Sequence, residues 1–207
     1  MSHTCRYLVL ATALSLSSAC SILPQAEPAD IYRLPSAQST RTVPHSTLWS
    51  LRVNKPIASN VLNSPRIAVV PQGDLISSYK GARWSDPAPT LLRNRMLDAF
   101  QRDGRVQRLS ADDSNLQSDY EIAGELQAFQ SEYSADGLAV VIRYDARLVQ
   151  GRSQRILASR RFEVRQPVSD KQVSAVVSSF GTASDQLMKQ LVDWTVVQAG
   201  QLQAKNQ

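Results

Sequence analysis

Residues 65–109 read PRIAVVPQGDLISSYKGARWSDPAPTLLRNRMLDAFQRDGRVQRL. Residues 66–71 are rich in β-branched side chains and have the length of a strand, and residues 72–74 then supply turn chemistry. Residues 75–79 follow as a second run of strand length. The pattern therefore predicts two strands joined by a short hairpin.

A helix is predicted directly after this hairpin. Asp86 precedes Pro87, so its carboxylate can accept the free N–H groups of the first turn, while proline occupies a position where its missing N–H has no cost. Asp103 and Gly104 predict the end of the helix, and residues 106–109 predict a closing strand. The apolar positions recur at helical spacing and are Leu92, Met96, Ala99 and Phe100.

The same stretch carries a family resemblance. The run of residues 64–69, then Tyr79, the run of residues 83–87, and a helix with Leu97 and Phe100 resemble the auxiliary lipoproteins of ABC-type transport systems, including the paraquat-inducible auxiliary lipoprotein. The resemblance covers most of the chain after about residue 30. It implies an outer-membrane partner of inner-membrane lipid transporters that use mammalian-cell-entry (MCE) domains.

The family motif within this stretch comprises Tyr79, Trp84, Asp86 and Pro87, to which we assign structural roles. Trp84 lies two residues ahead of the expected helix cap, where an aromatic ring can pack against the first turns of the helix and fix the angle of chain entry. We therefore expect Trp84 to be buried and structural.

Residues 1–19 resemble a lipoprotein signal peptide. Arg6 closes a short basic region, residues 7–16 are apolar but too short to span a bilayer, and residues 16–20 read LSSAC. Cleavage before Cys20 would leave it as the only cysteine of the mature chain, ready for acylation. Ser21 is typical of export to the outer membrane. The alternative is a plain secretory signal with a coincidental cysteine.

Residues 20–44 are predicted to form a lipid anchor and flexible tether, because prolines lie among Ser, Thr, Ala and Gln with little periodicity. Residues 30–35 interrupt this composition and are either a small docking strand or a loosely laid apolar patch. We assign residues 45–199 to the folded auxiliary domain and residues 200–207 to a polar tail that frays.

The folded domain is predicted to be α+β, with a mixed, mostly antiparallel sheet and two main helices packed on one face. Residues 47–53 alternate as a strand with the Trp49 face buried, and the chain from Tyr120 reads as a three-stranded meander with a hairpin at Asp136 and Gly137. Apolar and charged residues alternate along the meander, so one face needs a cover.

The last helix is the predicted cover. Ser169 and Gln172 form the pattern of a capping box, and apolar residues then recur at a spacing of three and four as far as Trp194. Gly181 in the middle of this helix costs roughly 1 kcal/mol relative to alanine, which indicates a bend or close packing there.

Catalysis, metal binding and cofactor binding are poorly supported. His45 is the only histidine expected in the mature chain, so a Ser-His-Asp arrangement and a histidine metal site both lack members. The acidic run of residues 112–115 lacks the spacing of a calcium loop. Glu121 and Glu125 share a strand face with arginines and fit a solvated ion-pair face. No Walker A motif is present, so ATP hydrolysis would belong to another chain.

The expected partners are a bilayer and other proteins. The formal net charge of +5 comes from scattered arginines without interleaved aromatics, so we expect no nucleic-acid partner. The preferred function is a non-catalytic, periplasm-facing outer-membrane lipoprotein that docks the conduit of an MCE system for phospholipid traffic. The alternative is a structural envelope lipoprotein or scaffold without a transport role.

A homo-oligomeric ring is also expected, because relatives in this family form rings. Val141 and Val149 fall on the otherwise charged face of the meander, and Phe129 and Leu138 flank the hairpin. Arginines that could pair with acidic residues of a neighbour surround them, including Arg143 and Arg147. The alternative interpretation is that single exposed valines are ordinary surface residues and form no subunit contact.

Overall fold

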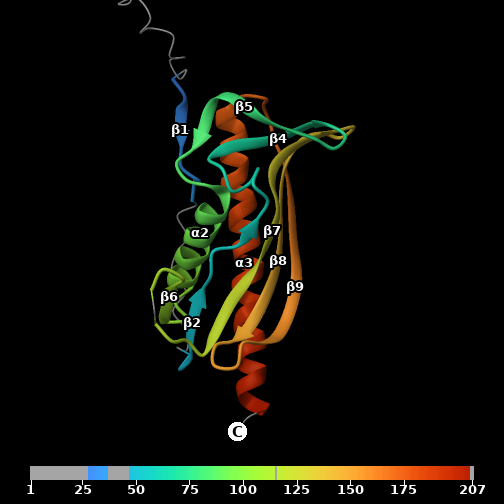
Figure 1. Ribbon diagram of the computed structural model, residues 1–207. Coiled ribbons are helices and arrows are strands. Elements are labelled where there is room, and N and C mark those ends of the chain that lie inside the picture. The colour runs from blue at the N-terminus through green and yellow to red at the C-terminus, as the bar shows by residue number, and fades with distance from the viewer. Residues whose placement is uncertain (1–27, 37–46, 115, 206–207) are drawn as a thin grey trace, which may run out of the picture.

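The computed structural model describes residues 28–36, 47–114 and 116–205. These residues form a nine-stranded mixed sheet and two helices (Figure 1). The strands are β1 (Asp30–Tyr32), β2 (Ser50–Val53), β3 (Ile57–Ala58), β4 (Arg66–Gln72), β5 (Leu75–Trp84), β6 (Arg108–Ala111), β7 (Tyr120–Ser134), β8 (Gly137–Gln150) and β9 (Arg155–Pro167). The helices are α2 (Ala88–Asp103) and α3 (Val173–Lys205). The predicted signal peptide, Cys20 and His45 lie outside the described residues.

The long strand β7 organises the sheet. It pairs antiparallel with β8 along its length, and β8 pairs antiparallel with β9, which confirms the predicted meander. On its other edge, β7 pairs in parallel with β2, β3 and β4. The β4–β5 hairpin then extends the sheet to β1. The expectation of a mixed, mostly antiparallel sheet is therefore confirmed.

The two helices complete the α+β fold by covering one face of this sheet. Helix α3 packs against β8 and β9, while α2 packs against α3, β2 and β6. Alternate residues of the meander fill the space beneath, and Ile142, Tyr144 and Leu148 are completely buried there. Trp49, Leu51 and Val53 extend the same core to β2, as their alternation predicted.

The expected cap of α2 is wrong. Pro87, rather than Asp86, is the N-cap residue, and its carbonyl accepts hydrogen bonds from the N–H groups of Thr90 (2.9 Å) and Leu91 (3.1 Å). A capping side chain accepts a hydrogen bond from the backbone N–H two or three residues later. Pro89, three residues after Asp86, has no N–H to donate. Asp86 instead accepts a hydrogen bond from the Ser85 hydroxyl at 2.9 Å.

The C-terminal end of α2 follows the prediction. Gly104 adopts a left-handed conformation with φ of 78°, and its N–H donates to the carbonyl of Phe100 at 3.1 Å. The closing strand is displaced by two residues from the expected range, since β6 begins at Arg108. Val106 is buried before that strand begins.

Both predicted ends of α3 need correction. No capping box involving Ser169 starts the helix; the N–H of Gln172 donates to the Asp170 carboxylate (3.1 Å), and the Gln172 carbonyl accepts from Val176 (3.1 Å). The predicted polar tail is helical through Gly200 to residue 205, because the helix hydrogen-bond ladder continues there. Helix α3 therefore continues beyond residue 199.

Candidate functional site

The N-terminal segment docks on the folded domain. Strand β1 pairs in parallel with the end of β5, with Tyr32 opposite Trp84. The N–H of Ser85 donates to the Tyr32 carbonyl at 2.8 Å. Tyr32 and Leu34 are partly buried against the core. The small-strand interpretation of residues 30–35 is confirmed, and these residues do not belong to a free tether.

Pro35 is packed against both helices. Its carbonyl accepts a hydrogen bond from the Arg95 guanidinium of α2. On α3, a Cβ placed at Gly181 would lie 3.0 Å from the carbonyl oxygen and 3.0 Å from the Cβ of Pro35. The close packing predicted at Gly181 is therefore confirmed, because the docked segment occupies the space that a side chain would need.

Arg95 is a buried charge that the sequence patterns did not reveal. It is 5% exposed, and its Nη2 lies 2.9 Å from the Asp185 carboxylate of α3. Burial lowers the pKa of Arg95, and the nearby charge of Asp185 opposes that effect. Arg95 lies three residues after Leu92 and so falls on the buried stripe of α2, which was the available signal. It joins α2, α3 and the docked segment.

Three aromatic rings pack together where β5, β7 and α3 meet. Trp84 is 1% exposed and makes edge contacts with Phe129 of β7 (ring centroids 5.9 Å apart) and Phe180 of α3 (5.2 Å). Phe129 and Phe180 are stacked with centroids 4.7 Å apart. This burial supports a structural role for Trp84. It also shows that Phe129 is a core residue and not an exposed neighbour of the hairpin.

Tyr79 connects the β4–β5 hairpin to β7. Its hydroxyl and that of Ser131 are 2.9 Å apart and share a hydrogen bond. Burial raises the pKa of Tyr79, with the Ser131 hydrogen bond acting in the opposite direction. Ser131 is completely buried, so this pair fixes the base of the hairpin in place.

The ends of the β4–β5 and β7–β8 hairpins carry exposed apolar side chains. We call residues 71–76 and 133–138 together the arm tip. Leu75 is 62% exposed, Ile76 is 45% exposed and Tyr133 is 38% exposed. Figure 1 shows both hairpins projecting to the side of α3. The sequence marked this region only as two turns, because strand periodicity does not show which turn residues remain uncovered.

The predicted exposure of Val141 and Val149 is wrong. Val141 is 1% exposed and Val149 is 8% exposed in a single subunit. Both lie on the charged face as expected, but long side chains from neighbouring strands surround them: Val141 pairs with Gln130 and with Arg165. Leu138 is half-buried against the core. The valines therefore do not form an exposed apolar patch.

The arginines of this face already have partners within the subunit. The Arg143 guanidinium contacts Glu163 at 2.7 Å and Arg147 contacts Glu125 at 2.8 Å. Arg161 and Arg165 pair likewise with Asp145 and Glu132. The strand register places Arg143 directly opposite Glu163, which explains the intrasubunit pairing. These arginines therefore form ion pairs within one subunit, and their contribution to a contact with a neighbouring subunit stays a prediction.

Glu121 and Glu125 are held by different groups. Glu121 is 8% exposed, lies 3.6 Å from Arg52 and accepts a hydrogen bond from Asn54 at 3.0 Å. Glu125 pairs with Arg147, as the ion-pair interpretation predicted. Within residues 28–36, 47–114 and 116–205, no group of three or more His, Cys, Asp or Glu side chains is arranged to hold a metal ion.

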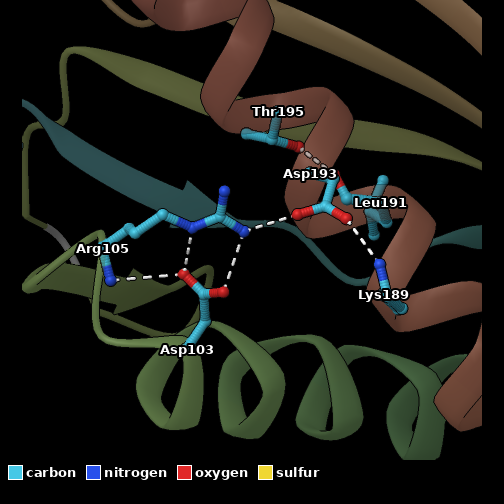
Figure 2. Close-up of polar contacts among 6 residues, drawn as sticks. All are labelled: Asp103, Arg105, Lys189, Leu191, Asp193 and Thr195. Carbon is cyan, nitrogen blue, oxygen red and sulfur yellow. Dashed lines mark hydrogen bonds and ion pairs between the residues drawn. The ribbon is translucent and has the colours of Figure 1, made fainter. Parts of the chain in front are cut away.

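A second polar cluster joins the C-terminal end of α2 to the middle of α3 (Figure 2). Arg105 donates to both oxygens of Asp103, at 2.6 and 2.8 Å, and to Asp193 of α3 at 2.6 Å. Lys189 donates to the other Asp193 oxygen at 3.0 Å. The Arg105 hydrogen bond lowers the pKa of Asp193. The cluster connects the C-terminal turn of α2 to α3 and consists of saturated structural contacts.

A related crystal structure supports the same architecture. Protein XCC0632 from Xanthomonas campestris has a TM-score of 0.79 and 31% identity, covering 85% of this chain and 99% of that one. A second crystal structure, of an uncharacterized protein, has a TM-score of 0.63 and 16% identity over 81% of this chain and 98% of the other, which shows a shared fold alone.

Sequence comparisons give the family. An uncharacterized protein from Bradyrhizobium diazoefficiens is 27% identical over 167 residues, which are 80% of this chain. The match spans only 44% of that relative's length. The profile of the ABC-type transport auxiliary lipoprotein component matches residues 32–192, from β1 into α3. The chain therefore belongs to the family of ABC-type transport auxiliary lipoprotein components.

Proposed function

We propose that this protein is the non-catalytic outer-membrane component of an ABC-type MCE lipid transport system. In this role it docks the periplasmic conduit to the outer membrane and assists phospholipid traffic. The family match over residues 32–192 is the observation that carries the proposal. An auxiliary subunit needs surfaces and attachment rather than a catalytic centre, and the polar clusters described above are occupied by structural pairs.

Attachment would come from acylated Cys20, which lies outside the described residues. Within the part of the chain that the structure describes, no helix has the length and hydropathy needed to cross a membrane. Acyl chains supply attachment by another route, at ~10 kcal/mol for each chain from its buried methylenes. Two or more such chains make a stable anchor.

The anchor is tested by replacing Cys20 with alanine. We expect the wild-type protein to carry an acyl mass and to fractionate with the outer membrane, and the Cys20→Ala variant to become soluble in the periplasm. A variant that stays on the membrane, together with a wild type that carries no acyl mass, would overturn the lipoprotein part of the proposal.

A ring of identical subunits is part of the same proposal, because a conduit that docks on several copies requires a side-to-side contact between different patches. Val141 and Val149 are buried within one subunit, so we do not include them among the proposed contact residues. Leu138, Arg143 and Arg147 keep accessible surface and remain the proposed contact residues, with the arginines contributing from the rim. Light scattering of the mature chain tests the ring, and a monomer at micromolar concentration would exclude it.

The second candidate is a structural envelope lipoprotein or scaffold with no transport role. Saturated ion pairs across the meander favour a rigid body and fit this role equally well. Copurification separates the two candidates. An MCE-domain protein with its permease and ATPase, recovered together with the tagged chain and bound lipid, would support transport, whereas envelope polymers or unrelated scaffolds would support the structural role.

A further inference from the structure

We propose that the arm tip inserts into the headgroup region of the membrane to which the protein is anchored, with Leu75, Ile76 and Tyr133 as the inserting side chains. This inference deepens the proposed function and rests on it through the acylation of Cys20. The proposed partner of the arm tip is a phospholipid surface and not a second copy of this chain.

The two hairpin ends lie side by side because of the strand register. Strand β4 runs parallel to β7, with Val70 opposite Glu132, so both strands continue in the same direction into their turns. The turn after β4 contains Gly73, whose φ of 53° suits glycine, and the turn after β7 ends at Gly137 with φ of 105°. Leu75 and Ile76 therefore stand at the same end of the sheet as Tyr133.

The described N-terminal segment points toward that same end. Strand β5 runs away from the arm tip, and β1 is parallel to it, so Asp30 lies at the end of β1 nearer the tip. Asp30 is opposite Ala82, seven residues after Leu75. At ~3.3 Å per strand residue, the path along β5 from the tip to this level is at most about 23 Å. Figure 1 shows β1 and the arm near one end of α3, with the C-terminal end of α3 opposite.

The chain between the anchor and β1 is long enough for the tip to meet the bilayer. Nine residues lie between Cys20 and Asp30, and the ten Cα-to-Cα steps from one to the other reach at most about 35 Å. This reach exceeds the distance from the tip to the level of Asp30. Because residues 30–36 are docked and cannot lengthen the tether, the bilayer also cannot lie far from this end of the domain.

The chemistry of the arm tip fits a lipid interface. Leucine and isoleucine favour the boundary of the acyl chains, and tyrosine places an apolar ring and a polar hydroxyl at headgroup level. Asp74 and Asp136 lie in the two turns, so they limit insertion to a shallow depth and do not attract anionic lipid. Apolar contact would therefore drive binding, and salt would weaken it little.

The test uses the mature chain, residues 20–207, with Cys20→Ser, which removes the anchor and every remaining cysteine. An environment-sensitive fluorophore is placed at Ile76→Cys, and vesicles of phosphatidylethanolamine and phosphatidylglycerol are added. We expect a blue shift and quenching by brominated lipid. The matched control carries the label at Val197→Cys, an exposed position near the C-terminal end of α3, and should show neither change.

A second measurement removes the apolar side chains without a label. Leu75→Ser with Ile76→Ser should weaken vesicle partitioning by roughly tenfold or more. The control pair is Leu48→Ser with Val197→Ser. Both residues are exposed. Leu48 lies just before β2, which pairs with the start of β7, at the end of that strand away from the tip. Val197 lies toward the C-terminal end of α3, which Figure 1 shows opposite the arm. This control pair should leave partitioning unchanged.

Three results would overturn the proposal. The first is a fluorophore at position 76 whose emission does not change when vesicles are added. The second is an equal loss of vesicle partitioning in the two pairs of serine substitutions. The third is a fluorescence change that depends on protein concentration in the absence of vesicles, which would make the tip a contact between subunits. The mass of Cys20 in the wild-type protein is measured in parallel. An acylated protein with a silent tip would remove this inference and leave the proposed function standing, whereas an unacylated protein would remove the anchor on which both depend.

Discussion

Replacement of Trp84 by alanine tests how the docked segment and the core are joined. The ring is 1% exposed and makes edge contacts with Phe129 and Phe180, so its loss leaves a cavity where β5, β7 and α3 meet. Removal of a buried tryptophan costs about 3 to 5 kcal/mol. Within the described residues, the indole Nε1 has no hydrogen-bond partner, so the whole loss comes from packing.

The assay is urea denaturation of the mature chain followed by circular dichroism, together with thermal melting. A loss of 3 to 5 kcal/mol should lower the melting temperature by roughly 10 °C for a chain of this size. Trp84→Phe is the matched control, because it keeps an aromatic ring and should recover at least half of the loss. Unchanged melting of Trp84→Ala together with lost partner binding would refute this reasoning and make Trp84 a contact residue.

Two further predictions concern the docked segment and acid stability. Gly181→Ala should release β1 by pushing against Pro35, seen as faster proteolysis of residues 28–36, while Gly200→Ala has open space at its Cβ and should change nothing. The backbone hydrogen bond from Ser50 lowers the pKa of Asp119, so this carboxylate stabilises the fold above about pH 4 and the effect disappears as pH falls through its folded pKa. In urea titrations, Asp119→Asn should therefore have a lower free energy of unfolding than the wild type at pH 6, and the difference should disappear near pH 2. A difference of the same size at both pH values would contradict this prediction.

The meander was predictable because its alternation extends over long strands, but one irregularity places Phe129 on the core face. A bulge between Leu126 and Ala128 shifts the register of β7. Phe129 consequently pairs with Ile142 on the core face, and Ala128 pairs with Arg143 on the charged face. A single extra residue reverses the faces of all later positions, and the sequence contains no separate signal for it.

The features that sequence patterns missed depend on contacts between distant segments. The docking of residues 30–35 requires β5 and α3 together, so its composition alone left two interpretations open. Arg95 appeared as an ordinary helix arginine because its partners, Pro35 and Asp185, come from elsewhere in the chain. Burial of Val141 likewise depends on long side chains of neighbouring strands. Local periodicity predicts on which face of a strand or helix a residue lies, but it does not predict which side chains from other segments cover that face.

Copurification from native membranes in mild detergent tests the central claim most directly. The acylated, tagged chain should recover an MCE-domain protein, its permease and its ATPase, together with bound phospholipid, and Cys20→Ala should reduce that recovery. A reciprocal experiment tags the MCE-domain protein. If that protein brings down its permease and ATPase but never this chain, and the acylated chain brings down none of the three, the role in lipid transport is contradicted.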